Sequence, residues 1–332
     1  MSYRKEFIIN TFRELIFKET GNSIDRIENL RADASDRKIY RLFSKGKTLI
    51  GIFNENEKEN LAFINFTGTF IKLGLNVPEI ISVSDDNLFY IEEDLGDVTL
   101  YKFISESAED DHIELYRKCL SGLIEFQIKA KEEIDYSYCY QTRKFDLDVI
   151  DSDLAKFDEY FKMADTENLT GESIRPAILE HSEKILYNIR NDFFLYRDFQ
   201  PRNIMIKGKI LYYIDYQSGR KGPLQYDLAS FLFSGSINIT DQEREILMDH
   251  YLNELGKYIF IDKERFVSDY YFLAFLRILQ MLGSYSYLNF KKNNTDVLKK
   301  VPKALKNLKC LINKIDNAKI NNYIIKLNSL TG

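Results

Sequence analysis

The chain has 332 residues and a mass of 39.1 kDa, enough for two domains with separate hydrophobic cores. Its 45% hydrophobic and 29% charged residues exclude an intrinsically disordered protein. The 46 Lys and Arg residues are outnumbered by 51 Asp and Glu residues, so the net charge of −5 provides no global positive field for nucleic acid.

Membrane and secretion signals are not expected either. No apolar run approaches the roughly 20 residues that span a bilayer, and the N-terminal segment lacks the apolar core of a signal peptide. Cys119, Cys139 and Cys310 are widely spaced and form no C-x-x-C pair. Together these features predict a cytoplasmic protein with no membrane partner and no structural zinc.

The first 95 residues alternate between helical and strand patterns. Apolar spacing predicts a helix over 3–19 and another over 57–73, the second ending at Gly74. Short β-rich runs, separated by turn residues, predict two strand pairs. These runs are 39–43 with 48–53, and 79–83 with 88–92.

Beyond residue 95 the pattern is mainly helical. Helix-like stripes cover 112–131, 147–163, 173–191, 241–257, 262–290 and 295–328, and short strands are expected at 193–195, 203–206 and 211–214. The sequence therefore predicts an α+β protein of two lobes. Residues 1–95 are expected to form a small lobe with an antiparallel sheet and a helix, and 96–332 a mostly helical large lobe.

The most informative segment is residues 196–203, Tyr-Arg-Asp-Phe-Gln-Pro-Arg-Asn, followed by Ile-Asp-Tyr-Gln at 214–217. The carboxylate of Asp198 can accept the proton of an attacking hydroxyl, and Asn203 and Asp215 offer the hard oxygen ligands that suit Mg²⁺. One such residue on a loop is usually a cap or turn former. The whole set, with strands on both sides, predicts a nucleotide-dependent phosphotransferase or a descendant that has lost activity.

These residues also resemble a known family. The 196–205 run, Ile-Asp-Tyr-Gln and the Gly-Pro-Leu-Gln-Tyr-Asp-Leu-Ala run at 222–229 are similar to motifs of the aminoglycoside phosphotransferase (APH)/choline kinase-like family of small-molecule kinases. The Arg-Asp-Phe-Gln and Asp-Tyr-Gln variants look most like its N-acetylmuramate/N-acetylglucosamine anomeric kinases. Segments 32–41, 75–80 and 92–97 extend the resemblance, whereas the helical C-terminal third matches no motif.

The resemblance implies a protein-kinase-like fold, ATP as phosphate donor and Mg²⁺ as cofactor. It also implies that residues 1–95 form a nucleotide-binding lobe and that 96–332 form the catalytic and substrate-binding lobe. It implies Asp198 as catalytic base and Asn203 and Asp215 as Mg²⁺ ligands. Asp227 would brace the catalytic loop, although a helix-capping role explains that carboxylate equally well. Arg197 would pair either with a phosphate or with Asp227.

The expected nucleotide-binding lobe departs from the kinase pattern. Residues 34–38 stand where kinases place a phosphate-covering loop, so Ser35, Arg37 and Lys38 are candidate phosphate contacts, although a solvated basic turn explains the loop as well. No lysine occurs within 48–53, where a protein kinase carries one. Either Arg37 or Lys38 supplies that charge, or Mg²⁺ and backbone hold the nucleotide.

Two further features of this lobe follow the resemblance. Glu57 and Glu59 are candidates for the acid that partners the strand lysine, but exposed helix-face roles are expected for both. Residues 92–95 resemble the hinge that receives adenine through main-chain hydrogen bonds, which assigns Glu93 and Leu95 to the nucleotide. Alternatively, the acidic run there only solvates the lobe junction.

Three functions are compatible with these residues. The first is an ATP- and Mg²⁺-dependent kinase for a small-molecule hydroxyl, with an amino sugar at its anomeric position as the preferred acceptor. The acidic residues between 146 and 159 keep an aminoglycoside acceptor open, with choline or ethanolamine behind it. The missing strand lysine motivates a non-catalytic nucleotide-binding module. Arg277 and Gln280, on an aromatic-rich helix, are possible substrate contacts.

Overall fold

The computed structural model describes residues 5–30, 36–107, 112–161 and 173–329. The chain forms two compact units, each built from several segments. The first comprises Met1–Phe103, Glu132–Arg143 and Arg202–Gly219, and the second comprises Ile104–Lys131, Lys144–Pro201 and Arg220–Gly332. The predicted division at residue 95 cuts the chain once, whereas in the structure two later segments return to the first unit.

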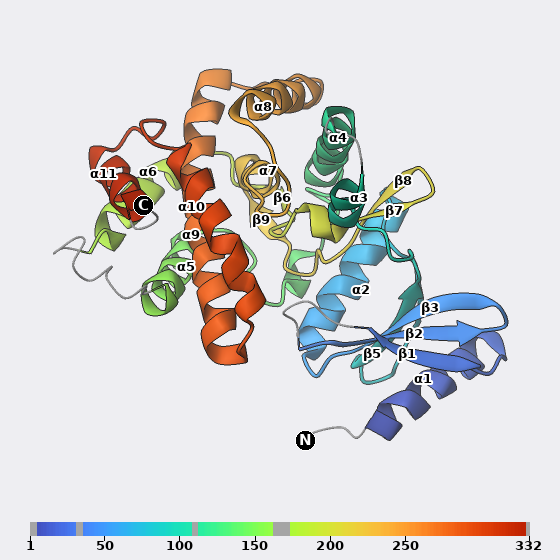
Figure 1. Ribbon diagram of the computed structural model, residues 1–332. Coiled ribbons are helices and arrows are strands. Elements are labelled where there is room, and N and C mark those ends of the chain that lie inside the picture. The colour runs from blue at the N-terminus through green and yellow to red at the C-terminus, as the bar shows by residue number, and fades with distance from the viewer. Residues whose placement is uncertain (1–4, 31–35, 108–111, 162–172, 330–332) are drawn as a thin grey trace. The chain divides into compact units, whose positions relative to one another are not determined.

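The first unit contains a five-stranded antiparallel sheet in the order β1-β2-β3-β5-β4 (Figure 1). Its strands are β1 (Arg26–Leu30), β2 (Lys38–Ser44), β3 (Lys47–Phe53), β4 (Ile80–Val83) and β5 (Phe89–Glu93). Lys45 and Gly46 join β2 to β3 with positive φ angles of 47° and 75°, the combination that a two-residue hairpin turn requires. The two predicted strand pairs are present, and β1 is an edge strand that no sequence pattern indicated.

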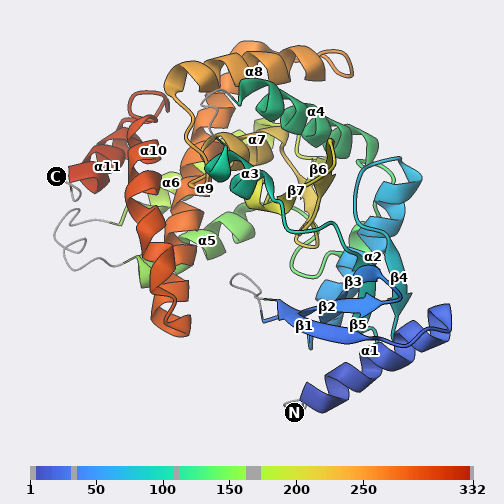
Figure 2. The ribbon, with the colours of Figure 1, turned by 45° about the vertical axis from the view of Figure 1, so that its right-hand side comes forward.

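Two helices cover the opposite faces of this sheet. Figure 2 shows helix α1 (Lys5–Thr20) lying along one face of the sheet. This helix buries Ile8 and Phe12 against a core that includes Phe89. Side chains alternate along a strand, so Tyr90 points to the other face, where its ring stacks on Phe63 of helix α2 (Glu57–Lys72) with centroids 5.3 Å apart. The hairpin of β7 (Ile204–Lys207) and β8 (Ile210–Tyr213) completes this unit.

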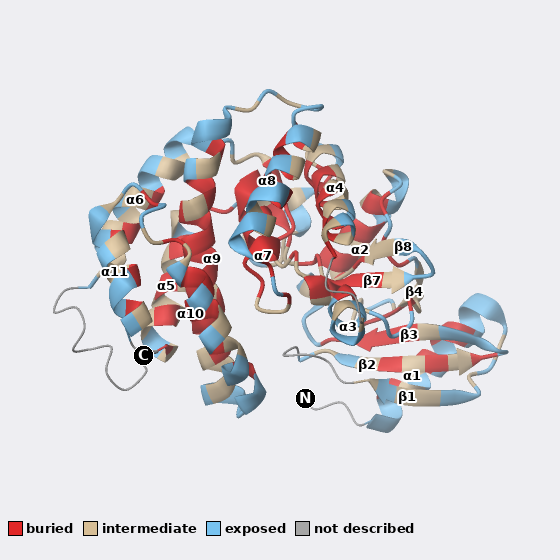
Figure 3. Cartoon of the chain, turned by 45° about the horizontal axis from the view of Figure 1, so that its top comes forward, coloured by how far each residue is buried: buried red, intermediate tan, exposed pale blue. Residues whose placement is uncertain are grey.

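The second unit is mainly helical. Its helices are α4 (Ile113–Lys129), α5 (Leu147–Tyr160), α6 (Arg175–Asn188), α7 (Leu224–Leu232), α8 (Asp241–Leu255), α9 (Lys263–Lys292), α10 (Val301–Lys309) and α11 (Ala318–Ser329). Of the short helices, η4 (Thr295–Lys300) belongs to this unit and η1 (Tyr136–Tyr138) to the first, while α3 (Leu100–Glu106) and η3 (Pro201–Asn203) span points in the sequence where one unit gives way to the other. Strand β6 (Phe193–Leu195) pairs with β9 (Arg220–Gly222). Every residue of α7 is buried, and Figure 3 shows it at the centre of the surrounding helices.

The predicted α+β class is confirmed. None of the helices in the described ranges has the length and apolar character that crossing a bilayer requires.

Helices α5 and α9 touch at a glycine. A Cβ atom on Gly283 would lie 2.9 Å from both the Cα and the N of Phe157, and neither backbone atom can move away easily. We expect Gly283→Ala to lower the free energy of unfolding by about 1–3 kcal/mol, because added volume in a packed interior forces backbone shifts.

Urea unfolding followed by circular dichroism measures this effect. Gly68→Ala is the matched control, because it lies on the exposed side of α2 with no atom within 4 Å of the added Cβ. It should be neutral or stabilise the protein by about 0.5–1 kcal/mol through helix propensity. Equal effects of the two substitutions would contradict the proposed close packing.

Candidate active site

In the first unit, the turn after β8 carries Asp215 in a left-handed conformation, with φ at 68°. Such a backbone costs on the order of 1–3 kcal/mol for a residue other than glycine and persists only where its surroundings impose it. The neighbouring Tyr216 supplies the restraint. Its ring stacks on Phe63 with centroids 4.8 Å apart and its hydroxyl pairs with Thr67, so helix α2 holds the turn.

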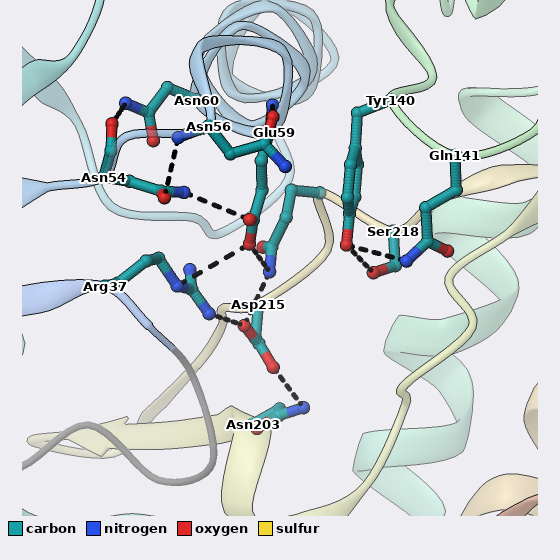
Figure 4. Close-up of polar contacts among 11 residues, drawn as sticks. Arg37, Asn54, Asn56, Glu59, Asn60, Tyr140, Gln141, Asn203, Asp215 and Ser218 are labelled. Carbon is teal, nitrogen blue, oxygen red and sulfur yellow. Dashed lines mark hydrogen bonds and ion pairs between the residues drawn. The ribbon is translucent and has the colours of Figure 1, made fainter. Parts of the chain in front are cut away.

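Among the described residues, Arg37, Gln217 and Asn203 bind the carboxylate of Asp215, at the centre of the contacts in Figure 4. Arg37 Nη2 lies 2.5 Å from Oδ1, Gln217 Nε2 donates to the same oxygen at 2.9 Å, and Asn203 Nδ2 donates to Oδ2 at 3.3 Å. Burial alone would raise the pKa of Asp215, but Arg37 and Gln217 lower it below its usual range. The carboxylate is therefore ionised at neutral pH, with about a third of its side chain exposed.

Arg37 is the basic residue that the structure brings to this cluster. Burial opposes its charge, yet Asp215 and Glu59 hold its pKa above the usual range, and its Nε lies 3.8 Å from Glu59 Oε1. Lys38 does not join it: that residue is exposed, with Nζ 5.5 Å from the centroid of the Phe53 ring. Ser35 lies outside the described residues.

The position of Glu59 corrects the expectation that its side chain lies on an exposed helix face. Its side chain is 17% exposed rather than on an open helix face, because it accepts from Asn54 Nδ2 at 3.0 Å in addition to facing Arg37. Glu57 remains exposed and accepts from Asn87. Of the two candidate acids, only Glu59 contacts the basic residue near Asp215.

The residues around Asp215 fit a magnesium ion. A carboxylate and an amide provide hard oxygen donors, and Mg²⁺ usually completes its shell with waters and substrate phosphates rather than with many protein ligands. No cluster of three or more His, Cys, Asp or Glu side chains suited to a metal occurs in the part of the chain that the structure describes. The candidate ligand set is therefore Asp215 with Asn203, whose side chain is largely buried beside it.

The expected hinge follows β5. Glu93 donates its N–H to the Glu79 carbonyl at 2.9 Å and its carboxylate accepts from Lys207 at 2.5 Å, while Leu95 is buried. Arg41 of β2 binds Asp94 at 2.7 Å and Asp97 at 2.8 Å. The acidic run is thus fixed to the sheet by ion pairs and does not merely solvate a junction.

In the second unit, Asp198 follows β6 on a tightly held turn. Arg197 has a φ of 79°, and the buried carboxylate of Asp227 accepts from the backbone N–H groups of Tyr196 at 2.6 Å and Arg197 at 2.8 Å. The Arg197 guanidinium does not pair with Asp227. It lies 2.6 Å from Asp153 and 2.8 Å from the Tyr226 hydroxyl.

Asp198 itself faces an arginine from α9. Arg277 Nη2 lies 3.1 Å from Asp198 Oδ1, and the same side chain donates to Ser230 at 3.1 Å and to Gln280. The Arg277 side chain is 3% exposed, whereas a third of Asp198 is exposed. A buried, fixed cation therefore orients a carboxylate that keeps part of its surface open.

Sequence reasoning did not assign three of these contacts. Gln217 lies inside the Asp-Tyr-Gln motif, which was its only signal, and Glu59 was placed on a solvent face. Arg277 was noted only as a possible substrate contact, because its helix lies far from Asp198 in sequence. Their partners come from distant elements, which local patterns do not reveal.

Comparisons with known proteins agree with this architecture. N-acetylmuramate/N-acetylglucosamine kinase from Neisseria meningitidis serogroup B is 25% identical over 226 residues, which cover 66% of this chain and 63% of that kinase. The chain thus matches less than two thirds of that relative's length. Amicoumacin kinase hAmiN, in complex with AMP-PNP, Ca²⁺ and Ami, has a TM-score of 0.68 at 12% identity, over 96% of this chain and 97% of that one.

A second solved structure, choline kinase LicA from Streptococcus pneumoniae, has a TM-score of 0.63 at 17% identity, over 91% of this chain and 99% of that one. These likenesses confirm the predicted protein-kinase-like fold. The sequence profile of the phosphotransferase enzyme family, APH, matches residues 26–261, which is most of the chain. The protein therefore belongs to the APH phosphotransferase family.

Proposed function

We propose that this protein is an ATP- and Mg²⁺-dependent phosphotransferase whose acceptor is the anomeric hydroxyl of an amino sugar of the N-acetylmuramate/N-acetylglucosamine type. The cluster of Asp215, Asn203 and Arg37 carries the proposal, because it combines two oxygen ligands with a fixed positive charge. The relative from Neisseria meningitidis supports the choice of acceptor. The proposal retains the expected cytoplasmic location, with neither nucleic acid nor membrane as partner.

In the proposed reaction, the acceptor oxygen forms a bond to the γ-phosphorus of ATP as the bond from that phosphorus to the departing ADP oxygen breaks. The acceptor proton passes to a carboxylate oxygen of Asp198, whose orientation Arg277 maintains. Asn203 and Asp215 would hold Mg²⁺, which when bound neutralises phosphate charge. Arg37 would contact the phosphates of ATP, and the main chain of Glu93 and Leu95 would receive the adenine.

The acidic run at 146–159 helps to choose between an amino sugar and an aminoglycoside as acceptor. Asp153 pairs with Arg197 at 2.6 Å and Asp151 with Arg175 at 2.7 Å, while Asp146 caps the N-terminus of α5. A polycationic aminoglycoside would need acidic groups that are not already neutralised. These contacts engage three of the six acidic residues of the run, which leaves fewer carboxylates for a polycationic acceptor.

The test is an acceptor screen with radiolabelled ATP in the presence and absence of Mg²⁺. We expect phosphorylation of N-acetylmuramate and N-acetylglucosamine, loss of turnover with EDTA, and an acid-labile product phosphate, which identifies the anomeric position. Turnover on kanamycin, choline or ethanolamine alone would replace the proposed acceptor. ATP binding without turnover on any of these acceptors would favour a non-catalytic module.

Arg37 offers a second test of the nucleotide site. Arg37→Met should raise the KM for ATP by about 10- to 100-fold, the equivalent of one or two charge-assisted hydrogen bonds to phosphate. Lys38→Met is the matched control and should change that KM less than threefold, because Lys38 lies on Phe53 rather than at Asp215. A larger effect at Lys38 would transfer the phosphate-binding role to that residue.

A further inference from the structure

Helices α5 and α9 together present a strip of polar side chains in the second unit. Asp153 and Lys156 come from α5, and Arg277, Gln280 and Tyr287 come from α9. Gly283 allows the two helices to approach closely, which keeps the two sets of side chains together. A hydrogen-bond chain runs along this strip from Asp198 through Arg277 and Gln280.

A small pocket, with room for about one water molecule, lies along the same helices. Its lining includes Asp153, Gln280, Tyr226, Phe145 and Leu276. Gln280 lines this pocket and accepts from Arg277, which in turn contacts Asp198, so the pocket and the proposed catalytic base are linked by one chain of contacts in this unit.

The carboxylates that interact electrostatically with Lys156 are already engaged by arginines. The two carboxylates, Asp153 and Asp198, are each held by an arginine, Arg197 at 2.6 Å and Arg277 at 3.1 Å. Lys156 adds a third cation. Its Nζ lies 4.5 Å from the centroid of the Tyr287 ring, and within the described ranges it forms neither a hydrogen bond nor an ion pair.

The environment of Lys156 disfavours an isolated positive charge. Burial lowers the pKa of the ammonium group, and Arg197 lowers it further, while Asp153 and Asp198 act in the opposite direction. A half-buried cation without a hydrogen-bonded partner is costly, and an anionic ligand would remove that cost. The tyrosine ring behind it supports the ammonium but provides no acceptor oxygen.

We propose that Lys156 binds an anionic group of the acceptor, so that the α5–α9 strip selects an acidic sugar over a neutral one. The inference rests on the proposed function and specifies its substrate class. N-acetylmuramate carries a carboxylate on its lactyl ether, and N-acetylglucosamine lacks this group. An ammonium–carboxylate contact is specific to the first sugar and leaves the transferred phosphate unaffected.

The test compares kcat/KM for the two sugars in the wild-type protein and in Lys156→Gln. We expect the wild type to prefer N-acetylmuramate by about 10- to 100-fold, and Lys156→Gln to lose that preference while its activity on N-acetylglucosamine changes less than threefold. Lys156→Arg should retain the preference. Lys184→Gln, on the exposed face of α6, is the matched control and should behave as the wild type.

Each alternative result has a distinct meaning. An equal loss on both sugars in Lys156→Gln would assign Lys156 to phosphate binding or to structure and overturn the inference. Unchanged kinetics on both sugars would also overturn it, provided that thermal unfolding shows an intact fold. Absence of wild-type turnover on either sugar, with turnover on another acceptor, would instead reject the proposed function and this inference with it.

Discussion

Asp198→Asn is expected to lower kcat by about 10²–10⁴-fold, the usual contribution of a general base. The amide keeps the size of the side chain and can still accept from Arg277, so the loop should keep its shape. It cannot take the proton of the acceptor hydroxyl at neutral pH. ADP release measures turnover, and calorimetry with ATP should show binding within threefold of the wild type.

The same measurements of turnover and ATP binding apply to a control variant. Asp296→Asn removes an exposed carboxylate whose ion pair in the described part of the chain is a local one with Lys299, and it should leave both turnover and ATP binding unchanged. If Asp198→Asn retained more than a tenth of the wild-type kcat, Asp198 would not be the base. If ATP binding were lost together with turnover, the residue would act in the nucleotide site instead.

The regular elements were accessible from sequence because their patterns are local. The β2–β3 hairpin was indicated by two β-rich runs around a Lys-Gly turn, and α2 by its apolar stripe. Strand β1 was missed. Its sequence, Arg-Ile-Glu-Asn-Leu, does not alternate, and as an edge strand it buries little on either face.

The site was predicted less completely, because its contacts join distant segments. Sequence could not choose between Arg37 and Lys38, since neighbouring residues in extended chain point to opposite faces and only the fold decides which face meets Asp215. Similarly, the acidic residues of α5 predicted a negative surface, because sequence did not show that arginines pair with some of them. Their partners, Arg175 and Arg197, lie more than twenty residues away in the chain.

The role of Asp227 also could not be decided from the sequence. From sequence, capping of a helix and bracing of the catalytic loop were equally good explanations of this carboxylate. In the structure it stands in the first turn of α7, fully buried, and accepts the two backbone N–H groups that lead into Asp198. The bracing role is therefore our proposal, and it predicts a loss of both stability and activity when the carboxylate is removed.

Asp227→Asn should lower the free energy of unfolding by about 1–3 kcal/mol and kcat by about 10²-fold. An amide offers one acceptor oxygen where the carboxylate offers two, so one buried N–H of Tyr196 or Arg197 loses its partner. Without that restraint the left-handed backbone of Arg197 can relax, and a shift of about 1 Å at Asp198 suffices for such a loss of rate. Urea unfolding and ADP release measure the two effects.

The loss of stability caused by Asp227→Asn should also depend on pH. Burial raises the pKa of Asp227 to about 7, against the opposing effect of the two backbone N–H groups, whereas in the unfolded chain the value is about 3.9. Because the folded state binds the proton more tightly, the contribution of Asp227 to stability is full below about pH 4 and declines as the pH rises to about 7. Asparagine does not titrate, so the deficit of Asp227→Asn should be larger at pH 5 than at pH 8. The control Asp296→Asn should show no such trend. If the stability deficit of Asp227→Asn instead grew with pH, the Asp227 carboxylate would be ionised throughout this range. Its two backbone hydrogen bonds would then outweigh the cost of its desolvation.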